Sequence, residues 1–462
     1  MKNKRREFLK KGIIGGMAFA VPSYNFAKRG KEGIHEYLGS FESRPRIGQS
    51  VMGLRAEPIS QVRIGIIGLG NRGFSMMKQV KAMTPDNAKI VAVCDIRKEK
   101  TEQALAEFGT DKPASYAGGE NEWKKLAGRD DLDLILIFTP WEYHVPMSLY
   151  AMQKEKHVAV EVPAALSVED CWALVNTAEE TQRNCMMLEN VCYGDEELWV
   201  LSMVQQGVFG ELTYGEAAYI HDLRDYFFKA YYKNWRSKHH LSRDGNLYPT
   251  HGLGPVAQYM DIQRGDKFDT MVSMSSRQMG MDLLAAKLPD SHEMAGTSGY
   301  KHGDMNNTLI KTAKGRTILL QHDVITPRPY NRKNALAGAK AYHEGYPSRL
   351  SVLGKESHHF LPEKEYAEYR ERYRSVVWKK MEDTIKEHGG HGGMDFLMIY
   401  RLITCFNKGL PLDMDVYDGA AWSVVFPLSE ISIQLGNSPV VFPDFTRGDW
   451  MKKRDLRMLW EI

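Results

Sequence analysis

The chain has 462 residues, of which 43% are hydrophobic and 26% charged, which suits a two-domain protein with a sizeable core. Its formal net charge is only +3, so a broad basic surface for nucleic acid is not expected. A disulfide scaffold and a metal site are disfavoured as well, because the cysteines are few, scattered and match no zinc spacing: Cys94, Cys171, Cys185, Cys192 and Cys405.

Residues 1–27 are predicted to be an export signal. A twin arginine, Arg5 and Arg6, lies in a basic segment, and an uncharged stretch rich in glycine and alanine follows at 12–20. This arrangement is typical of twin-arginine leaders, which carry folded proteins out of the cytoplasm. The alternatives are a disordered basic leader or a membrane anchor, but an anchor needs about 20 apolar residues. We expect the twin-arginine export machinery as a partner and a periplasmic, or secreted, location.

Residues 60–190 are predicted to form a dinucleotide-binding Rossmann domain. A short apolar run at 62–67, rich in β-branched residues, indicates a buried parallel strand. It leads into Gly68-Leu69-Gly70-Asn71-Arg72-Gly73, where the first glycine permits a tight turn, the second admits a pyrophosphate and the third lets a helix pack on the strand. The helix N-terminus then attracts the phosphate charge. The alternative is a glycine-rich turn that binds nothing.

A carboxylate ends the second predicted strand, 90–94. Asp95 follows the glycine motif by roughly 20 residues, the place from which a carboxylate accepts hydrogen bonds from the ribose hydroxyls. It would also repel a 2'-phosphate. The sequence therefore predicts NAD rather than NADP as the cofactor.

Two further predicted strands, 132–138 and 157–160, are each followed by polar or aromatic side chains. Because the carboxyl ends of parallel strands face the ligand crevice, these side chains are expected near the nicotinamide. Each alone is equally well read as a loop or capping residue, but the set is more persuasive. With the glycine motif, the cofactor candidates are Asn71, Arg72, Trp141, Glu142, Tyr143, His144, Glu161, Val162 and Asn190.

Residues 191–462 are predicted to form a larger, substrate-binding α/β domain. Candidate strands at 212–220, 270–275 and 316–321 alternate in polarity, as a half-exposed antiparallel sheet requires. The segment 225–236 is dense in aromatic and basic residues, a composition that suits sugar rings and their hydroxyl and acyl groups. A nucleic-acid surface would need a wider basic stripe. Protein–protein contact and core filling are the alternatives for this segment.

Two histidines stand in distinctive surroundings. His251 lies in Tyr248-Pro249-Thr250-His251-Gly252, and His391 lies in Gly389-Gly390-His391-Gly392-Gly393. Four glycines allow the backbone almost any conformation, so His391 can reach a leaving group, and an unperturbed imidazole titrates near neutral pH. The alternatives are a core histidine in the first case and a hinge with an incidental histidine in the second.

The order of these motifs resembles the glucose-fructose oxidoreductase and inositol dehydrogenase family. Its members join a Rossmann domain to a larger α/β domain built on an open, mainly antiparallel sheet. Ordinary members have Glu-Lys-Pro with a catalytic lysine where this chain has Glu161-Val162-Pro163. They also have an aspartate shortly before the active-site histidine, whereas here the first one upstream of His251 is Asp244. Since Val162 cannot move a proton, alcohol oxidation would have to be arranged differently.

The whole set of motifs, with the leader, is similar to glycoside hydrolase family 109, whose founding members are bacterial, NAD-dependent α-N-acetylgalactosaminidases. The resemblance implies release of terminal α-linked N-acetylgalactosamine from a glycan or glycoconjugate. It also implies a loop histidine that donates a proton, and a homodimer formed through an exposed sheet face. The motifs are Asn71-Arg72, 139–144, 161–165, 248–252 and 329–332.

An exported enzyme has no obvious nicotinamide pool, so a cofactor regenerated within each turnover is expected. The expected route is oxidation of the sugar at C3, loss of the C2 proton, departure of the aglycone from C1, addition of water and reduction, an exception to two-carboxylate glycosidases. His251 and Tyr193 are the candidate bases and His391 the candidate acid. The residues expected to hold the sugar and its N-acetyl group are Tyr219, Arg236, Tyr248, Pro249, Thr250, His251 and Tyr330.

Two other function classes fit parts of the sequence. A periplasmic NAD(P)-dependent sugar oxidoreductase with a tightly bound, internally recycled cofactor would explain export, but Val162 and the missing aspartate before His251 disfavour it. A sugar-binding protein without activity would not need the complete phosphate loop, Asp95 and both histidines.

Overall fold

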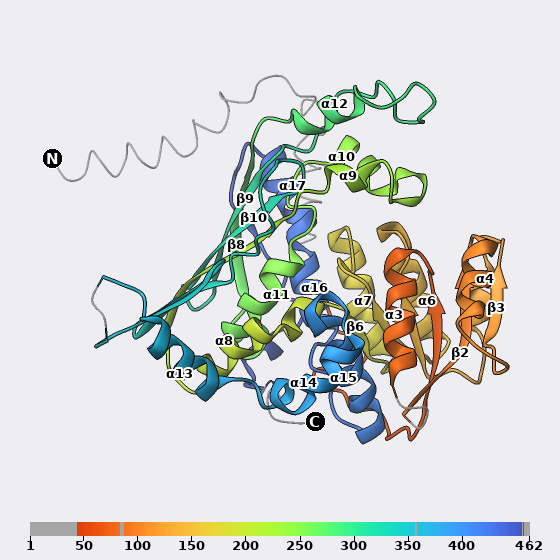
Figure 1. The fold of residues 1–462 in the computed structure, drawn as a ribbon, viewed down its shortest axis with the longest axis horizontal. Coiled ribbons are helices and arrows are strands. Elements are labelled where there is room, and N and C mark those ends of the chain that lie inside the picture. Colours follow the sequence, from red (N-terminus) through yellow and green to blue (C-terminus); the bar gives the residue numbers. More distant parts are fainter. Residues whose placement is uncertain (1–43, 84–86, 356–357, 455, 457–462) are drawn as a thin grey trace.

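The computed structural model describes residues 44–83, 87–355, 358–454 and 456. The expected export signal, residues 1–27, lies outside these ranges. Within them the chain forms two units, each built on one sheet, with helices packed between the two sheets (Figure 1). No helix of the described ranges is long and apolar enough to cross a membrane.

The first unit is a parallel sheet of six strands in the order β3-β2-β1-β4-β5-β6. All of its pairings are parallel, and the order reverses between β1 and β4, which is where an open α/β sheet binds its ligand. The sequence Leu134–Ile137 is buried at every position, as a central strand covered on both faces must be. The strands are β1 (Val62–Ile67), β2 (Ala88–Asp95), β3 (Ala114–Ala117), β4 (Leu134–Ile137), β5 (His157–Val160) and β6 (Cys185–Met187).

Helices connect these strands, and at α7 a side chain caps the first turn. The hydroxyl of Ser167 accepts a hydrogen bond from the backbone N–H of Asp170 at 3.0 Å and caps the longest of them, α7. The connecting helices are α3 (Asn71–Ala82), α4 (Lys98–Ala106), α5 (Glu122–Ala127), η3 (Trp141–Tyr143), α6 (His144–Gln153) and α7 (Val168–Thr181).

The second unit is an open sheet of eight strands in the order β13-β12-β11-β7-β10-β9-β8-β14. Its pairings are antiparallel except for β7 with β10, which is parallel. Residues of β9 alternate strictly between buried and exposed, so one face packs on helices and the other faces away from them. The strands are β7 (Leu212–Ile220), β8 (Phe268–Ser275), β9 (Asn306–Thr312), β10 (Thr317–Asp323), β11 (Ala335–Gly338), β12 (Ala341–Gly345), β13 (Ser348–Val352) and β14 (Val440–Val441).

Helix α11 packs closely on β7 because glycine stands at the contact. A β-carbon at Gly252 would lie 2.3 Å from the backbone nitrogen of Ala218, so only glycine allows this approach. The remaining elements of this unit are η4 (Asn190–Tyr193), α8 (Asp195–Gln205), α9 (Arg224–Phe227), η5 (Tyr232–Asn234), α10 (Trp235–Ser242), α11 (Thr250–Tyr259), α12 (Gly280–Ala285), α13 (Glu363–Tyr373), α14 (Val376–His388), η6 (His391–Gly393), α15 (Met394–Lys408), α16 (Val416–Ser423), α17 (Val425–Gln434) and η7 (Asp449–Met451).

Two late helices tie the units together. Helix α15 contacts α3, the helix that follows the glycine motif, and α16 contacts α7 and β6. Both lie between the two sheets (Figure 1). The start of α15 therefore lies beside the dinucleotide loop. Arg72 and Asp395, which form a hydrogen bond there, are 323 residues apart in the sequence.

Candidate active site

The loop between β1 and α3 has the steric requirements of a dinucleotide cradle. A β-carbon at Gly68, whose φ is +89°, would lie 2.6 Å from the carbonyl oxygen of Phe138, and one at Gly73 would lie 1.9 Å from the carbonyl oxygen of Gly68. At Gly70 the nearest atom, Nη2 of Arg97, is 3.7 Å away. The packing of the protein thus requires glycine at positions 68 and 73, whereas Gly70 leaves space in which a pyrophosphate fits.

Asp95 ends β2 next to this loop and is almost fully buried. Its Oδ2 accepts a hydrogen bond from the backbone N–H of Leu69 at 2.7 Å, and its Oδ1 accepts one from the N–H of Arg97 at 2.9 Å. Nε of Arg97 also donates to Oδ1, at 3.3 Å, whereas Oδ2 has a second lone pair. The carboxylate therefore holds the loop in place, and its Oδ2 still has capacity for a ribose hydroxyl.

A charged network crosses from the loop into the second unit. Arg72, at the start of α3, donates from Nε to Glu161 at 2.6 Å and from Nη1 to Asp395 at 2.7 Å. Asp395 belongs to the first turn of α15 and is fully buried. Its other oxygen accepts a hydrogen bond from the side-chain amide of Asn190 at 2.8 Å. One carboxylate of the second domain therefore binds two of the predicted cofactor residues, Arg72 and Asn190.

His391 is the third partner of Asp395, after Arg72 and Asn190. Its Nδ1 lies 2.7 Å from Oδ2 of Asp395, and its side chain is 63% exposed, so the other ring nitrogen is accessible. Burial alone would raise the pKa of the Asp395 carboxyl, but the hydrogen bond from His391 and the charge and hydrogen bond of Arg72 hold that pKa well below its usual value. Asp395 therefore stays ionised and fixes the orientation of the His391 ring.

An aromatic and basic cluster stands on the second domain. The ring of Tyr219, from β7, lies 4.5 Å from that of Tyr248 and 5.3 Å from that of His251. The guanidinium of Arg236, from α10, lies 4.8 Å from the ring centroid of Tyr248 and 5.2 Å from that of Trp141. Its Nη1 donates to the hydroxyl of Tyr231 at 3.2 Å, whereas Nε and Nη2 are buried with no hydrogen-bond acceptor among the described residues.

His251 of the aromatic cluster and His391 of the charged network both affect the pKa of His221. Burial, followed by the charges of Arg236, His251 and His391, lowers the pKa of His221 below its usual value. The hydroxyl of Tyr219 lies 2.9 Å from Nδ1 of that ring. The charged network and the aromatic cluster also meet through two adjacent residues, because Glu189 contacts His251 at 2.7 Å and Asn190 donates to Asp395 at 2.8 Å.

A buried carboxylate that the sequence analysis did not single out holds His251. Glu189 follows β6, is fully buried, and its two oxygens lie 2.7 and 3.0 Å from Nδ1 of His251. One of these oxygens also accepts the backbone N–H of Val191 at 3.1 Å. The carboxylate partner of His251 is therefore Glu189, just after β6, and takes the place of the aspartate that is missing shortly before His251 in the sequence.

Two family models cover most of the chain. Residues 193–452 match the model described as glycosyl hydrolase 109, C-terminal domain, and residues 62–189 match the oxidoreductase family with an NAD-binding Rossmann fold. The chain belongs to glycosyl hydrolase family 109. The family, the fold and the NAD-binding Rossmann domain expected from the sequence are thereby confirmed.

Relatives in family 109 match over nearly the whole length. A glycosyl hydrolase family 109 protein 1 of Shewanella sp. (strain MR-4) is 46% identical over 456 residues, which cover 96% of each chain. A family 109 protein of Shewanella baltica (strain OS155 / ATCC BAA-1091) is 45% identical over 462 residues, covering 98% of each.

Solved structures share the fold at much lower identity. Levoglucosan dehydrogenase in complex with NADH superposes with a TM-score of 0.64 at 15% identity, covering 83% of this chain and 99% of that one. An oxidoreductase domain protein from Kribbella flavida gives a TM-score of 0.66 at 16% identity, covering 84% and 100%. The family 109 chain therefore shares the two-unit architecture of these oxidoreductases.

The structure gives two expected site residues hydrogen-bond partners within the protein. The hydroxyl of Tyr193 is buried and donates to Asp413 at 3.1 Å, in the interior of the second domain. Both ring nitrogens of His144 face backbone carbonyls, of Pro163 at 2.8 Å and of Thr139 at 2.9 Å, and the ring is fully buried. Thr250 is buried at the start of α11, and its hydroxyl has no hydrogen-bond partner among the described residues.

The other expected residues lie at the edges of the site. Trp141 is buried and its ring lies 6.0 Å from that of Tyr248, so the loop after β4 contacts the aromatic cluster. Tyr143 and Tyr330 are exposed, and the hydroxyl of Tyr330 accepts a hydrogen bond from Arg332 at 2.8 Å. The rest are Glu142, which pairs with His239 at 3.6 Å, Val162, which is buried, and Pro249, which precedes α11.

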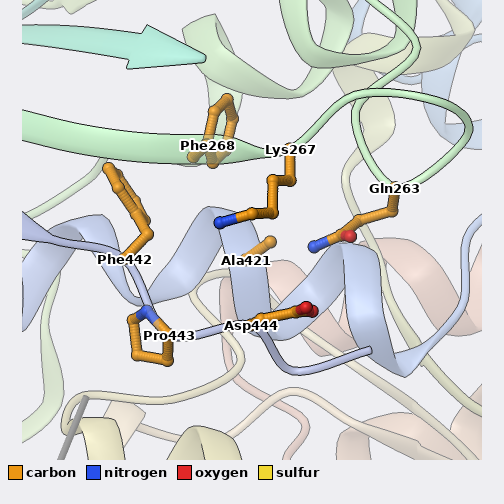
Figure 2. A pocket seen from close by; sticks show the side chains of 7 residues that line it. All are labelled: Gln263, Lys267, Phe268, Ala421, Phe442, Pro443 and Asp444. Carbon is orange, nitrogen blue, oxygen red and sulfur yellow. The ribbon is translucent and has the colours of Figure 1, made fainter. Parts of the chain in front are cut away.

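A separate pocket lies elsewhere on the second domain (Figure 2). Asp444 accepts hydrogen bonds from the backbone N–H groups of Thr446 and Gly448, and Lys267 lies 3.9 Å from Asp269. Oε1 of Gln263 is buried and has no hydrogen-bond partner among the described residues. None of its lining residues belongs to the site described above. They are Gln263, Lys267, Phe268, Ala421, Phe442, Pro443 and Asp444.

Proposed function

We propose that this family 109 enzyme releases terminal α-linked N-acetylgalactosamine from glycans or glycoconjugates, and that NAD is oxidant and reductant within one turnover. The observation that carries the proposal is the position of Asp395. This second-domain carboxylate binds Arg72 of the dinucleotide loop and the candidate acid His391, each at 2.7 Å. The cofactor loop and the acid for the leaving group are thereby held together by one carboxylate. A glycosidase that uses its cofactor within the hydrolytic cycle requires such an arrangement.

The residues that would hold NAD fit it sterically and chemically. Gly70 leaves room for the pyrophosphate, and Oδ2 of Asp95 has a lone pair for the ribose. Asn190 and Glu161 are assigned to the nicotinamide end. When bound, the nicotinamide accepts a hydride reversibly, so that C3 of the sugar can be a ketone in mid-cycle and an alcohol again at the end. Val162 places no proton-transfer group at the position of the usual lysine.

His251 is the group assigned to proton transfer at C3 and C2. The Glu189 carboxylate accepts a hydrogen bond from Nδ1–H, so the lone pair of the neutral ring is on Nε2, which can accept a proton from the sugar. The hydroxyl of Tyr248, 3.5 Å from Nε2, supplies a neighbouring exchangeable proton. The C3 ketone makes the C2 proton acidic, and its removal by this base prepares the C1–O bond for cleavage.

His391 is the group assigned to the leaving oxygen. Its exposed ring nitrogen can donate a proton to the aglycone oxygen as the C1–O bond breaks, and Asp395 stabilises the protonated ring before this transfer. Water then adds at C1, C2 regains a proton, and the C3 ketone is reduced. Arg236, whose Nε and Nη2 have no acceptor among the described residues, is assigned to the N-acetyl carbonyl.

We also propose that residues 1–27 direct export through the twin-arginine machinery to the periplasm. A nicotinamide that is regenerated in each turnover needs no pool there. A homodimer through the exposed face of the eight-stranded sheet is proposed on the resemblance alone.

The function is tested with p-nitrophenyl α-N-acetylgalactosaminide and the purified enzyme without added NAD. Release of p-nitrophenol is expected, and deuterium at C2 is expected to slow turnover or to exchange with solvent. Full retention of C2 deuterium at an unchanged rate would instead indicate direct displacement at C1. Release that requires a second sugar or added NAD would indicate the alternative, a sugar oxidoreductase with a recycled cofactor.

A further inference from the structure

A guanidinium lies over the entrance to the dinucleotide loop. Arg97 comes two residues after β2, and its Nε lies 3.3 Å from Oδ1 of Asp95. Its Nη2 is the atom closest to the position that a β-carbon on Gly70 would take, at 3.7 Å. Arg97 therefore stands between the carboxylate that suits a ribose and the open space that suits a pyrophosphate.

The second domain reaches this arginine with one aromatic ring. Tyr232 opens η5, and the Cζ of Arg97 lies 4.7 Å from its ring centroid. Lys233 and Asn234 adopt left-handed φ values of 50° and 49°, which makes a tight turn that carries Tyr232. Asn234 anchors this turn by donating to Glu293 at 2.7 Å. The contact therefore joins the second domain to the adenosine end of the loop.

We propose that Arg97 binds the adenosine half of the dinucleotide and that Tyr232 is a positioning residue that holds Arg97 over it. A guanidinium offers two faces, and with Tyr232 on one the other can stack on a purine ring, while its charge attracts the pyrophosphate. The proposal deepens the proposed function, because a cofactor that is recycled in place must outlast each turnover. It depends, however, only on NAD binding by the Rossmann domain.

The test measures how long the dinucleotide stays bound. The enzyme is loaded with NADH, and dissociation is followed by the loss of its bound fluorescence after addition of excess NAD, with no sugar present. Tyr232→Ala is expected to raise the dissociation rate about 2- to 5-fold, the range of an exposed cation–π contact. Arg97→Gln is expected to raise it on the order of tenfold, because the charge is lost as well.

Two further variants make the result specific. Tyr232→Phe keeps the ring face and is expected to match the wild type. Tyr226→Ala removes an exposed tyrosine of the neighbouring helix α9 and is also expected to match it. The proposal is overturned if Tyr232→Ala releases NADH at the wild-type rate, or if Tyr226→Ala or Tyr232→Phe accelerates release as much. Glycosidase activity is measured separately, so absence of hydrolysis with slow NADH release refutes the proposed function and leaves this clamp standing.

Discussion

Glu189→Gln isolates the buried carboxylate behind His251. In the wild type the donors to the Glu189 oxygens, among the residues that the structure describes, are Nδ1 of His251 and the backbone N–H of Val191. The ring is thereby held with its hydrogen on Nδ1 and its lone pair on Nε2. A glutamine has the same size, but its amide N–H₂ can donate to Nδ1. The ring then carries its hydrogen on Nε2 and has no lone pair for a substrate proton.

The expected loss follows from what this lone pair does. A positioned general base contributes about 10²- to 10⁴-fold, and replacing the carboxylate that orients a catalytic histidine by its amide costs up to about 10⁴-fold. We therefore expect kcat to fall by 10²- to 10⁴-fold, or about 3–5 kcal/mol. The carbonyl oxygen of glutamine can still accept the Val191 N–H, so the fold is expected to remain.

The assay compares kcat on p-nitrophenyl α-N-acetylgalactosaminide for the wild type, Glu189→Gln and Glu189→Asp. NADH affinity and the melting temperature are measured on the same samples and are expected to be unchanged for Glu189→Gln. Glu189→Asp keeps the charge at shorter reach and is expected to lose less activity. A Glu189→Gln enzyme with more than a third of wild-type kcat would refute the assignment of His251 as a carboxylate-oriented base.

Three other changes test separate parts of the structure. Asp395→Asn removes the charge shared by Arg72 and His391 and is expected to lower kcat about 10- to 100-fold. The control Asp383→Asn, on the exposed side of α14, is expected to leave kcat unchanged, and equal effects of the two variants would contradict the network. Gly70→Ala is expected to weaken NADH binding more than about tenfold at an unchanged melting temperature, because its β-carbon meets only Nη2 of Arg97, at an ordinary contact distance of 3.7 Å. Gly73→Ala, with a β-carbon 1.9 Å from a carbonyl oxygen, is expected to lower the melting temperature; the reverse pattern would contradict the cradle. Burial, with the charge of Arg183, lowers the pKa of His157 to about 4, and Nδ1 of the ring accepts a hydrogen bond from the N–H of Asn184. The unfolded chain therefore binds the proton at a higher pH than the folded protein, and stability is lost as pH falls from about 6.5 to about 4. His157→Gln is expected to reduce this loss by on the order of 2 kcal/mol in denaturant titrations at pH 7 and pH 4, and an unchanged difference between the two pH values would count against it.

The dinucleotide unit could be predicted because its determinants are local. The strand 62–67, the glycines and Asp95 lie within one βαβ segment, and backbone sterics fix what each glycine must do. Strand 212–220 was likewise readable from alternation, and it coincides with β7. The expected strands 270–275 and 316–321 overlap β8 and β10, with ends shifted by one to two residues where polar residues flank the pattern.

The carboxylates of the site could not be predicted in the same way, because their partners come from distant segments. Glu189 is 62 residues from His251, and Asp395 is 323 residues from Arg72. A weak signal existed in each case. Glu189 follows a buried strand at the same sheet edge as Glu161, and Asp395 lies four residues after His391 at the start of a helix. Tyr193 gives the opposite lesson, since the short helix η4 turns its ring inward to Asp413.

The site therefore exists only when both domains are folded against each other. Arg72 and Glu161 come from the Rossmann domain, whereas Asp395 and His391 come from the start of a helix that packs on α3, and Tyr232 reaches Arg97 from a third segment. A chain exported unfolded would have to assemble this junction, and find its dinucleotide, outside the cytoplasm. The proposed twin-arginine leader removes that requirement, because such leaders carry proteins that are already folded. If the leader exports the folded enzyme and NAD is recycled within each turnover, the enzyme must be exported with its dinucleotide already bound between the domains.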